Sequence, residues 1–268
     1  MTLMTGGAPF TSAQNLALPH GANLDGPIRR DGDVGIAVPA ILLVDCSWSM
    51  EAVLPAAQAA LVNFTKRLRS EAVSSSVWLG IITFADQART VLPMTQIADP
   101  SVRLPDLRPT GDGTNFEAAF TESLSQFRAD LDRIGTRTDG GKRKVYRPSL
   151  YMVTDGEPNT GGDWRVPSRE LNTRSWRPNR MTFGMGQANR DIIREISSEG
   201  MAYFADDGQT PESMFDAIMQ IILRSTVTQA KSAQDPALTG AVPFPVIDPA
   251  DDPATAGIAL LDPINTID

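Results

Sequence analysis

The sequence predicts an α/β fold with a mostly parallel sheet that is covered by helices on both faces. Short apolar runs typical of strands alternate along the chain with segments whose apolar residues recur at helical spacing. Residues 40–44 are apolar at every position, as expected for a strand that is buried on both faces of a sheet. Because strands that alternate with helices form mostly parallel sheets, the pattern predicts one α/β domain.

Six strands and four helices are expected in this domain. The third strand is expected to pair with the second as a hairpin, and the longest helix is expected before the fourth strand. An insert at residues 161–179 is predicted to be irregular. The expected strands are 40–44, 77–84, 88–92, 150–154, 180–185 and 202–205, and the expected helices lie near 53–68, 116–134, 192–196 and 214–222.

The two ends of the chain differ in composition from its middle. Residues 1–36 are rich in Gly, Pro, Asn and Asp without periodicity, so we expect an N-terminal arm that is flexible until it docks. Residues 229–268 repeat Asp-Pro pairs, which predicts an acidic, Pro-rich C-terminal tail whose short apolar pieces lie on the domain or on a partner. Residues 37–228 are then the α/β domain.

Composition excludes several functions. The chain has 268 residues and a net charge of -8, and an acidic surface repels phosphate backbones, so no nucleic-acid binding is expected. Cys46 and His20 are the only residues of their types, which excludes an intramolecular disulfide and a cysteine-based zinc site. The N-terminus lacks the pattern of a secretory signal, and no apolar stretch is long enough to span a bilayer. We therefore expect a cytoplasmic protein without a membrane segment.

Three loops combine hydroxyls with carboxylates. Asp45, Ser47 and Ser49 follow the first strand at alternate positions, so their side chains converge if the loop is extended. Thr114 follows a Gly-Asp-Gly segment and precedes the longest helix, and Asp155 follows the fourth strand. Ligands of open α/β sheets bind at the carboxyl ends of the strands, so the three loops are expected to meet there.

The chemistry of these side chains suits a hard divalent cation. Three neutral hydroxyls and two carboxylates offer the oxygen ligands that Mg²⁺, Mn²⁺ or Ca²⁺ prefers. If the hydroxyls bind directly and the aspartates act through water, the ion keeps much of its charge. It then attracts a carboxylate from another molecule, which is a route to metal-dependent protein binding without catalysis.

The motif Asp45-x-Ser47-x-Ser49, with Thr114 and with Asp155 before a glycine, resembles the metal-ion-dependent adhesion site (MIDAS) of von Willebrand factor A (vWA) domains. The resemblance covers residues 37–226. It implies a doubly wound sheet of six strands with one antiparallel edge strand, and a MIDAS metal held by these five residues. It also implies a binding function rather than an enzymatic one.

Within that family, the chain is most similar to the bacterial cytoplasmic TerY-like group of tellurium-resistance proteins. The similar segments are residues 44–50, Pro55, residues 155–158 and Asp163-Trp164-Arg165. This resemblance implies a role in a bacterial stress-response or defence system, with kinase, phosphatase or ATPase components as partners. The single cysteine excludes the Cys-rich zinc module that some TerY-like proteins carry.

Three residues are candidates for the rim that a partner contacts. Trp48 stands where the family usually has glycine, and its ring either restricts access to the metal or contacts a partner. Trp164 either pins down the insert or anchors an interface, and Glu157 either reaches the rim or is a solvated loop residue. Asp112 either caps the helix that follows it or accepts a hydrogen bond behind the metal ligands, and we expect the cap.

The sequence leaves three functions open. The first is a scaffold or adaptor that recruits a partner through an acidic residue. The second is a structural protein whose metal site is vestigial or is filled by an aspartate of its own tail. The third is a metal-dependent phosphohydrolase with Asp45 as nucleophile, but Ser47 stands where a second aspartate is needed, and no histidine in the domain can act as a base.

Overall fold

The computed structural model of the protein describes residues 35–235, 237 and 244–261. The chain divides into two units, residues 1–33 and 34–268, and the described residues all belong to the second unit. Apart from residues 35 and 36, which begin the first strand, the predicted N-terminal arm lies outside the described residues.

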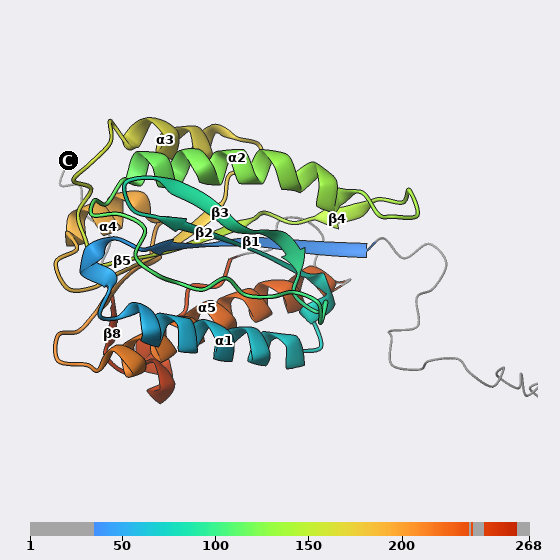
Figure 1. Ribbon diagram of the computed structural model, residues 1–268. Helices are drawn as coiled ribbons and strands as arrows, with labels where there is room; N and C mark the ends of the chain where they lie inside the picture. The colour runs from blue at the N-terminus through green and yellow to red at the C-terminus, as the bar shows by residue number, and fades with distance from the viewer. Residues whose placement is uncertain (1–34, 236, 238–243, 262–268) are drawn as a thin grey trace, which may run out of the picture. The chain divides into compact units, whose positions relative to one another are not determined.

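The second unit alternates strands and helices along the chain, as Figure 1 shows. The helices are α1 (Leu54–Ser70), α2 (Phe116–Gly135), α3 (Arg165–Thr173), α4 (Arg190–Ile196) and α5 (Pro211–Gln234). The strands are β1 (Gly35–Asp45), β2 (Val77–Phe84), β3 (Ala88–Gln96), β4 (Arg143–Val145), β5 (Ser149–Thr154), β6 (Asn179–Gly184), β7 (Ala202–Ala205) and β8 (Ile258–Leu260).

The strands form one mostly parallel sheet in the order β3-β2-β1-β5-β6-β7-β8, and β4 pairs with the start of β1. The pairs β2–β3 and β7–β8 at the two edges are antiparallel. The predicted fold class is confirmed, and the six expected strands are β1, β2, β3, β5, β6 and β7. The additional strands β4 and β8 have three residues each, too few for a recognisable pattern.

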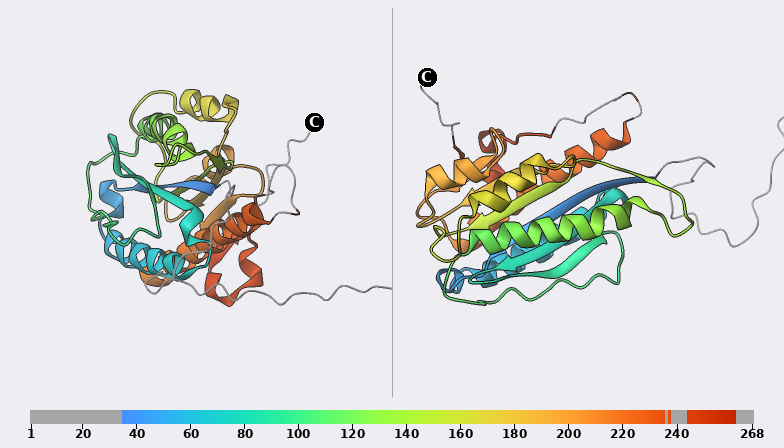
Figure 2. Two further views of the ribbon diagram at one scale, coloured as in Figure 1. Left: turned by 90° about the vertical axis from the view of Figure 1, so that its right-hand side faces the viewer. Right: turned by 90° about the horizontal axis from the view of Figure 1, so that it is seen from above.

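Helices cover both faces of the sheet (Figures 1 and 2). Helices α1 and α5 pack on one face, while α2, α3 and α4 pack on the other. Strand β1 lies in the middle, where Leu42 and Val44 join the core beneath α1 and α5. The residues that alternate with them, Ile41 and Leu43, join the core beneath α2. Because successive side chains point to opposite faces, a strand covered on both sides is mostly apolar.

The insert at residues 161–179 is not irregular throughout, because it contains α3. This helix has only nine residues, of which three are buried, so it is shorter than the segments from which helical periodicity is read. It is held on α2 by Trp164, whose ring contacts those of Phe116 and Phe120 at centroid distances of 6.2 Å. This contact fixes the position of the helix on α2.

The predicted boundary at residue 228 falls inside α5, which continues to Gln234. Part of the predicted tail, residues 244–261, packs on the domain. The Tyr203 hydroxyl donates to the Ile247 carbonyl at 2.8 Å, and Arg224 pairs with Asp252 at 3.0 Å. Strand β8 from this segment pairs with β7, which otherwise ends the sheet with unpaired backbone groups. None of the described helices is long and apolar enough to cross a membrane.

Candidate metal centre

The first loop begins where β1 ends, and backbone hydrogen bonds hold it on both sides. The Cys46 amide donates to the Phe84 carbonyl of β2 at 2.7 Å, and the Thr110 amide donates to the Cys46 carbonyl at 2.9 Å. Ser47 and Gly111 form an isolated parallel bridge. These bonds extend the direction of β1 as far as Ser47. The expectation of an extended loop is wrong beyond that point, because Trp48–Met50 form a 3-10 helix.

Hydroxyls and carboxylates of two loops meet in a continuous chain of hydrogen bonds. The hydroxyl oxygens of Ser47 and Ser49 are 3.1 Å apart, and the Ser49 hydroxyl donates to Asp155 Oδ1 at 2.8 Å. Asp155 follows β5, the neighbour of β1, so the two loops leave the same edge of the sheet side by side. Three of the five predicted ligands are therefore in direct contact.

Asp45 lies beneath this chain and is completely buried. Its Oδ1 accepts from the Ser47 amide at 2.9 Å, and its Oδ2 accepts from the Thr154 hydroxyl at 2.6 Å. Burial raises the pKa of Asp45 to about 6, although these hydrogen bonds lower it. The nearby charge of Asp155 raises the pKa by a smaller amount. Burial also raises the pKa of Asp155. Two desolvated carboxylates at one place favour a bound cation.

Thr114 reaches the site from the second loop. Its amide donates to the Asn159 side chain at 2.8 Å, and the Asn159 amide donates back to the Thr114 carbonyl at 3.1 Å. A Cβ atom on Gly156 would lie 3.0 Å from the Thr114 hydroxyl, so this glycine lets the second and third loops approach each other closely. The structure thus brings Thr114 against the residue that follows Asp155.

Asp86 organises the second loop and was not identified from the sequence. Its carboxylate accepts from the amides of Asp112 at 2.9 Å and Gly113 at 3.0 Å. A Cβ atom on Gly111 or Gly113 would lie within 2.4 Å of an Asp86 oxygen, so only glycine fits at both positions. The sequence did indicate a place for Asp86 near the site, since this residue follows the end of β2, at the same edge of the sheet as the other loops.

The expected helix cap at Asp112 is wrong. The cap of α2 is Asn115, whose side-chain oxygen accepts from the Ala118 amide at 2.9 Å. Its side-chain nitrogen donates to the Asp86 carbonyl at 3.0 Å. The start of α2 and the second loop are therefore held by the same two residues, Asp86 and Asn115.

We expect Asp86→Ala to lower the free energy of unfolding by about 2 kcal/mol, because two loop amides lose a charged acceptor. The loop that carries Thr114 then loses its support. Urea denaturation of the metal-free protein measures this effect, with Asp207→Ala, at an exposed position, as the control. Equal stability of the two variants would show that Asp86 does not hold the loop.

The three rim candidates have different environments. Trp48 is 61% exposed and belongs to the first loop, and Glu157 is exposed on the third. Trp164 is only 6% exposed, because its ring packs against Phe116 and Phe120. Its place at the partner-binding rim is therefore a wrong prediction, and its role is to anchor the insert.

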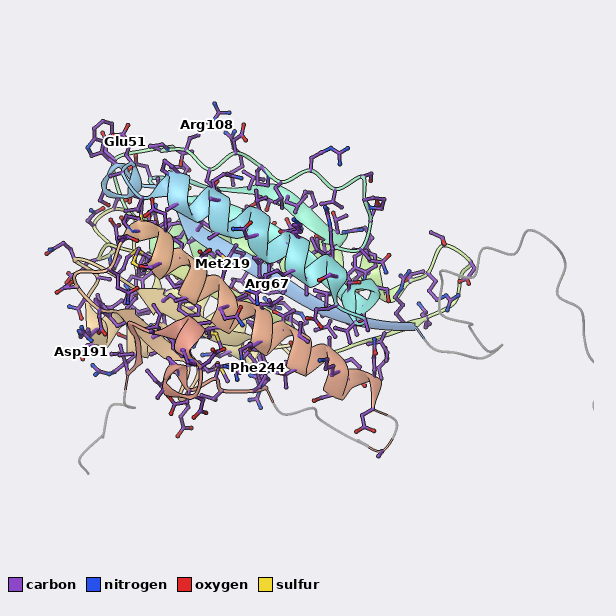
Figure 3. All side chains as sticks on the ribbon, turned by 90° about the horizontal axis from the view of Figure 1, so that it is seen from below. Glu51, Arg67, Arg108, Asp191, Met219 and Phe244 are labelled. Carbon is purple, nitrogen blue, oxygen red and sulfur yellow. The ribbon has the colours of Figure 1, made fainter. Side chains whose placement is uncertain are left out.

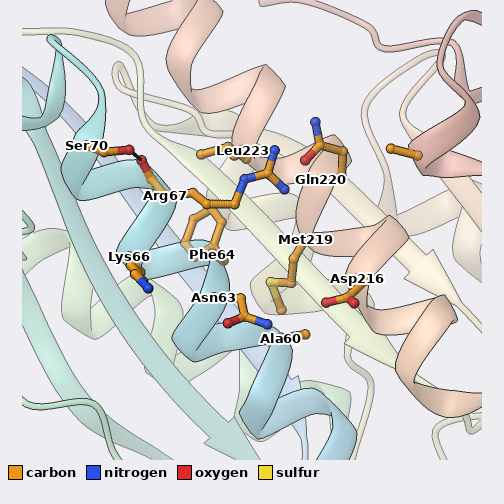
Figure 4. A pocket seen from close by; sticks show the side chains of 11 residues that line it. Ala60, Asn63, Phe64, Lys66, Arg67, Ser70, Asp216, Met219, Gln220 and Leu223 are labelled. Carbon is orange, nitrogen blue, oxygen red and sulfur yellow. Dashed lines mark hydrogen bonds between the residues drawn. The ribbon is translucent and has the colours of Figure 1, made fainter.

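Another hollow lies away from these loops, between α1 and α5 (Figure 4). It has a volume of about 470 Å³, and Phe64 and Met219 line it together with Arg67 and Gln220. None of its lining residues belongs to the three loops. Among the described residues, no three His, Cys, Asp or Glu side chains gather to hold a metal. A metal at the three loops therefore depends on hydroxyl oxygens as well as on the two aspartates.

The sheet is open and mostly parallel, and hydroxyl-bearing loops at its carboxyl edge surround the carboxylates of Asp45 and Asp155. These are the features of a vWA domain. The family model for the von Willebrand factor type A domain matches residues 41–217. The chain belongs to this family. Among the curated proteins, none matches the chain significantly.

Solved structures show the same fold at low sequence identity. The pilus adhesin SpaC from Lactobacillus rhamnosus GG is 14% identical with a TM-score of 0.55, over 72% of this chain and 30% of that chain. A von Willebrand factor type A protein from Catenulispora acidiphila is 12% identical with a TM-score of 0.50, over 72% and 43%. Proximal thread matrix protein 1 from the mussel byssus, with a zinc-occupied MIDAS motif, is 14% identical with a TM-score of 0.50, over 73% and 48%. The chain thus spans less than half the length of each.

Proposed function

We propose that this protein is a metal-dependent binding module that recruits a partner protein through one of the partner's acidic residues. Ser47, Ser49 and Thr114 supply hydroxyl ligands for a divalent cation, and Asp45 and Asp155 supply negative charge. The observation that carries the proposal is the chain of contacts from Ser47 through Ser49 to Asp155. It joins the hydroxyls of one loop to the carboxylate of another above the buried Asp45.

The side chains present fit such an ion. Hydroxyl and carboxylate oxygens are the ligands of hard cations, with Mg²⁺ as the first candidate and Mn²⁺ or Ca²⁺ as alternatives. The raised pKa values of Asp45 and Asp155 reflect burial of negative charge, which a cation offsets. When bound, the ion supplies a positive charge that attracts a carboxylate from outside. The zinc-occupied MIDAS motif of the mussel protein supports this assignment.

The reactive groups expected of a hydrolase are poorly placed here. Both oxygens of Asp45 accept hydrogen bonds and the residue is completely buried, so it is not exposed as a nucleophile. The Cys46 thiol is also buried, and burial raises its pKa to about 12, which keeps it protonated at neutral pH. These environments favour binding over catalysis.

The structural alternative, in which the tail fills the site, receives little support from two aspartates of the tail, Asp248 and Asp252. Asp248 and Asp252 accept hydrogen bonds from nearby backbone amides at the starts of two 3-10 turns. Asp252 also pairs with Arg224 of α5. These carboxylates are engaged on the domain rather than at the metal loops. A partner's carboxylate remains the better candidate for the metal.

The cellular setting of the proposal is a bacterial stress-response or defence system in the cytoplasm. It rests on the similarity to TerY-like proteins in the segments around Trp48, Glu157 and Trp164. In such a system the partner belongs to a complex with kinase, phosphatase or ATPase components.

Calorimetric titration of the chelated protein with Mg²⁺ and Mn²⁺ tests the metal site. We expect saturable binding at one site in the wild type, and affinity at least about tenfold lower in Ser47→Ala or Thr114→Ala, because each variant removes an oxygen ligand. Ser125→Ala, at an exposed position of α2, is the matched hydroxyl control. Equal binding by all four proteins would contradict the assignment.

A further inference from the structure

We propose that a cavity beside the first metal loop is a subsite for a second carboxylate of the same partner, held by Arg89 and Arg108. This inference rests on the proposed function, since it takes the partner to be an acidic segment that already places one carboxylate at the metal. It adds that the recognised segment has two acidic side chains rather than one.

The cavity has a volume of about 710 Å³ and lies between β3 and the loop that follows it. Arg89 enters it from the start of β3, opposite Thr83 of β2. Asp106, Arg108 and Thr110 enter it from the loop. Polar and charged residues make up most of the lining. Such a lining suits a small charged group better than an apolar side chain.

Backbone hydrogen bonds place this cavity next to the metal loop. Thr110, from one wall, donates its amide to the Cys46 carbonyl at 2.9 Å. Thr83, from the other wall, precedes Phe84, whose carbonyl accepts from the Cys46 amide at 2.7 Å. Cys46 stands between Asp45 and Ser47, so both walls of the cavity are connected to the loop that carries the proposed ligands. One extended partner segment can therefore contact the metal site and the cavity together.

The two arginines are available for a ligand. Both are exposed, and neither takes part in an ion pair among the described residues. Figure 3 shows the Arg108 side chain extending outward from its loop, at the same end of the domain as Glu51, which follows the metal loop. With Asp106 in the same lining, the cavity carries a net positive charge on a chain whose net charge is -8. Positive potential at this place favours an acidic partner.

The chemistry of the cavity favours a carboxylate over a phosphate. An arginine fork binds a carboxylate with two parallel hydrogen bonds, and the Thr110 hydroxyl offers a further donor. The Asp106 carboxylate repels any anion in the cavity, and it repels a doubly charged phosphate more strongly than a singly charged carboxylate. Asp106 therefore acts as a selectivity element, and its removal strengthens the subsite.

The test uses the full chain in Mg²⁺ and synthetic peptides with two aspartates joined by glycine linkers of increasing length. A matched peptide has asparagine in place of the second aspartate. Binding is followed by NMR titration, which detects weak complexes. For the best linker, we expect the two-acid peptide to bind the wild type about tenfold more tightly than the one-acid peptide. The Arg89→Gln/Arg108→Gln double variant should reduce this ratio to about one, and Asp106→Asn should increase it.

Arg103→Gln, from the same loop but outside the cavity lining, is the control and should keep the wild-type ratio. A ratio near one in the wild type, or a tenfold ratio that survives in the double variant, overturns the subsite. The proposed function fails separately, if binding of the one-acid peptide persists in EDTA and in Asp45→Ala. Absence of binding by every peptide in Mg²⁺ contradicts both.

Discussion

Asp45→Asn is expected to lower the Mg²⁺ affinity by about 100-fold and, at the same time, to stabilise the metal-free protein. The affinity falls because the variant removes one of two negative charges beside the proposed ion. The stability rises because the wild-type carboxylate is buried without a cation. Asparagine has the same shape, so its oxygen can accept from the Ser47 amide and its nitrogen can donate to the Thr154 hydroxyl.

The direction of the stability change follows from the pKa of Asp45, which burial raises from 3.8 to about 6. A carboxyl group whose pKa is higher in the folded state favours folding only while it is protonated. The metal-free wild type therefore loses stability as the pH rises from about 4 to about 6, and the loss is complete above that range. A shift of this size corresponds to a free energy on the order of 3 kcal/mol at pH 7.

Urea denaturation in EDTA at several pH values measures this effect. The stability advantage of Asp45→Asn should be full at pH 7 and should become small near pH 4, where the carboxyl is protonated in the folded state and about half protonated in the unfolded state. In excess Mg²⁺ the advantage of the variant should nearly disappear, because a 100-fold higher affinity gives the wild type up to about 2.7 kcal/mol more stabilisation from the ion. A variant less stable than the wild type at pH 7 in EDTA would show that the Asp45 charge is compensated within the protein.

Trp164→Ala is expected to lower the free energy of unfolding by about 3 to 5 kcal/mol, which is the usual effect of removing a buried tryptophan ring. The ring is 6% exposed and contacts the rings of Phe116 and Phe120. Its loss leaves a cavity at the point where α3 is held on α2. The melting temperature should fall by roughly 10 °C for a domain of this size.

Trp48→Ala is the matched control, because the same side chain is removed from a position that is 61% exposed. We expect its stability to differ from that of the wild type by less than about 0.5 kcal/mol. Thermal unfolding of the three proteins in EDTA makes the comparison. Similar losses in both tryptophan variants would mean that Trp164 is not part of the core. The two residues looked alike as rim candidates, and only their burial separates them.

The fold class was predictable from the amino-acid sequence, and so was the meeting of the loops that carry the five proposed ligands. A strand covered on both faces is mostly apolar, so the apolar runs within β1 and β5 could be recognised in the sequence. The carboxyl ends of parallel strands share one edge, so Asp45 and Asp155 could be placed together although they are far apart in the chain. These inferences depend on local periodicity and on one general rule of topology.

Other features have their causes in distant parts of the chain, and only the folded protein shows them. Trp164 holds the start of α3 on α2, and β8 is defined by its pairing with the edge of β7. The support of the second loop by Asp86 depends on a contact between segments that follow different strands. A sequence shows which side chains are available, but burial and hydrogen bonding are set by which segments meet, and that requires the folded chain.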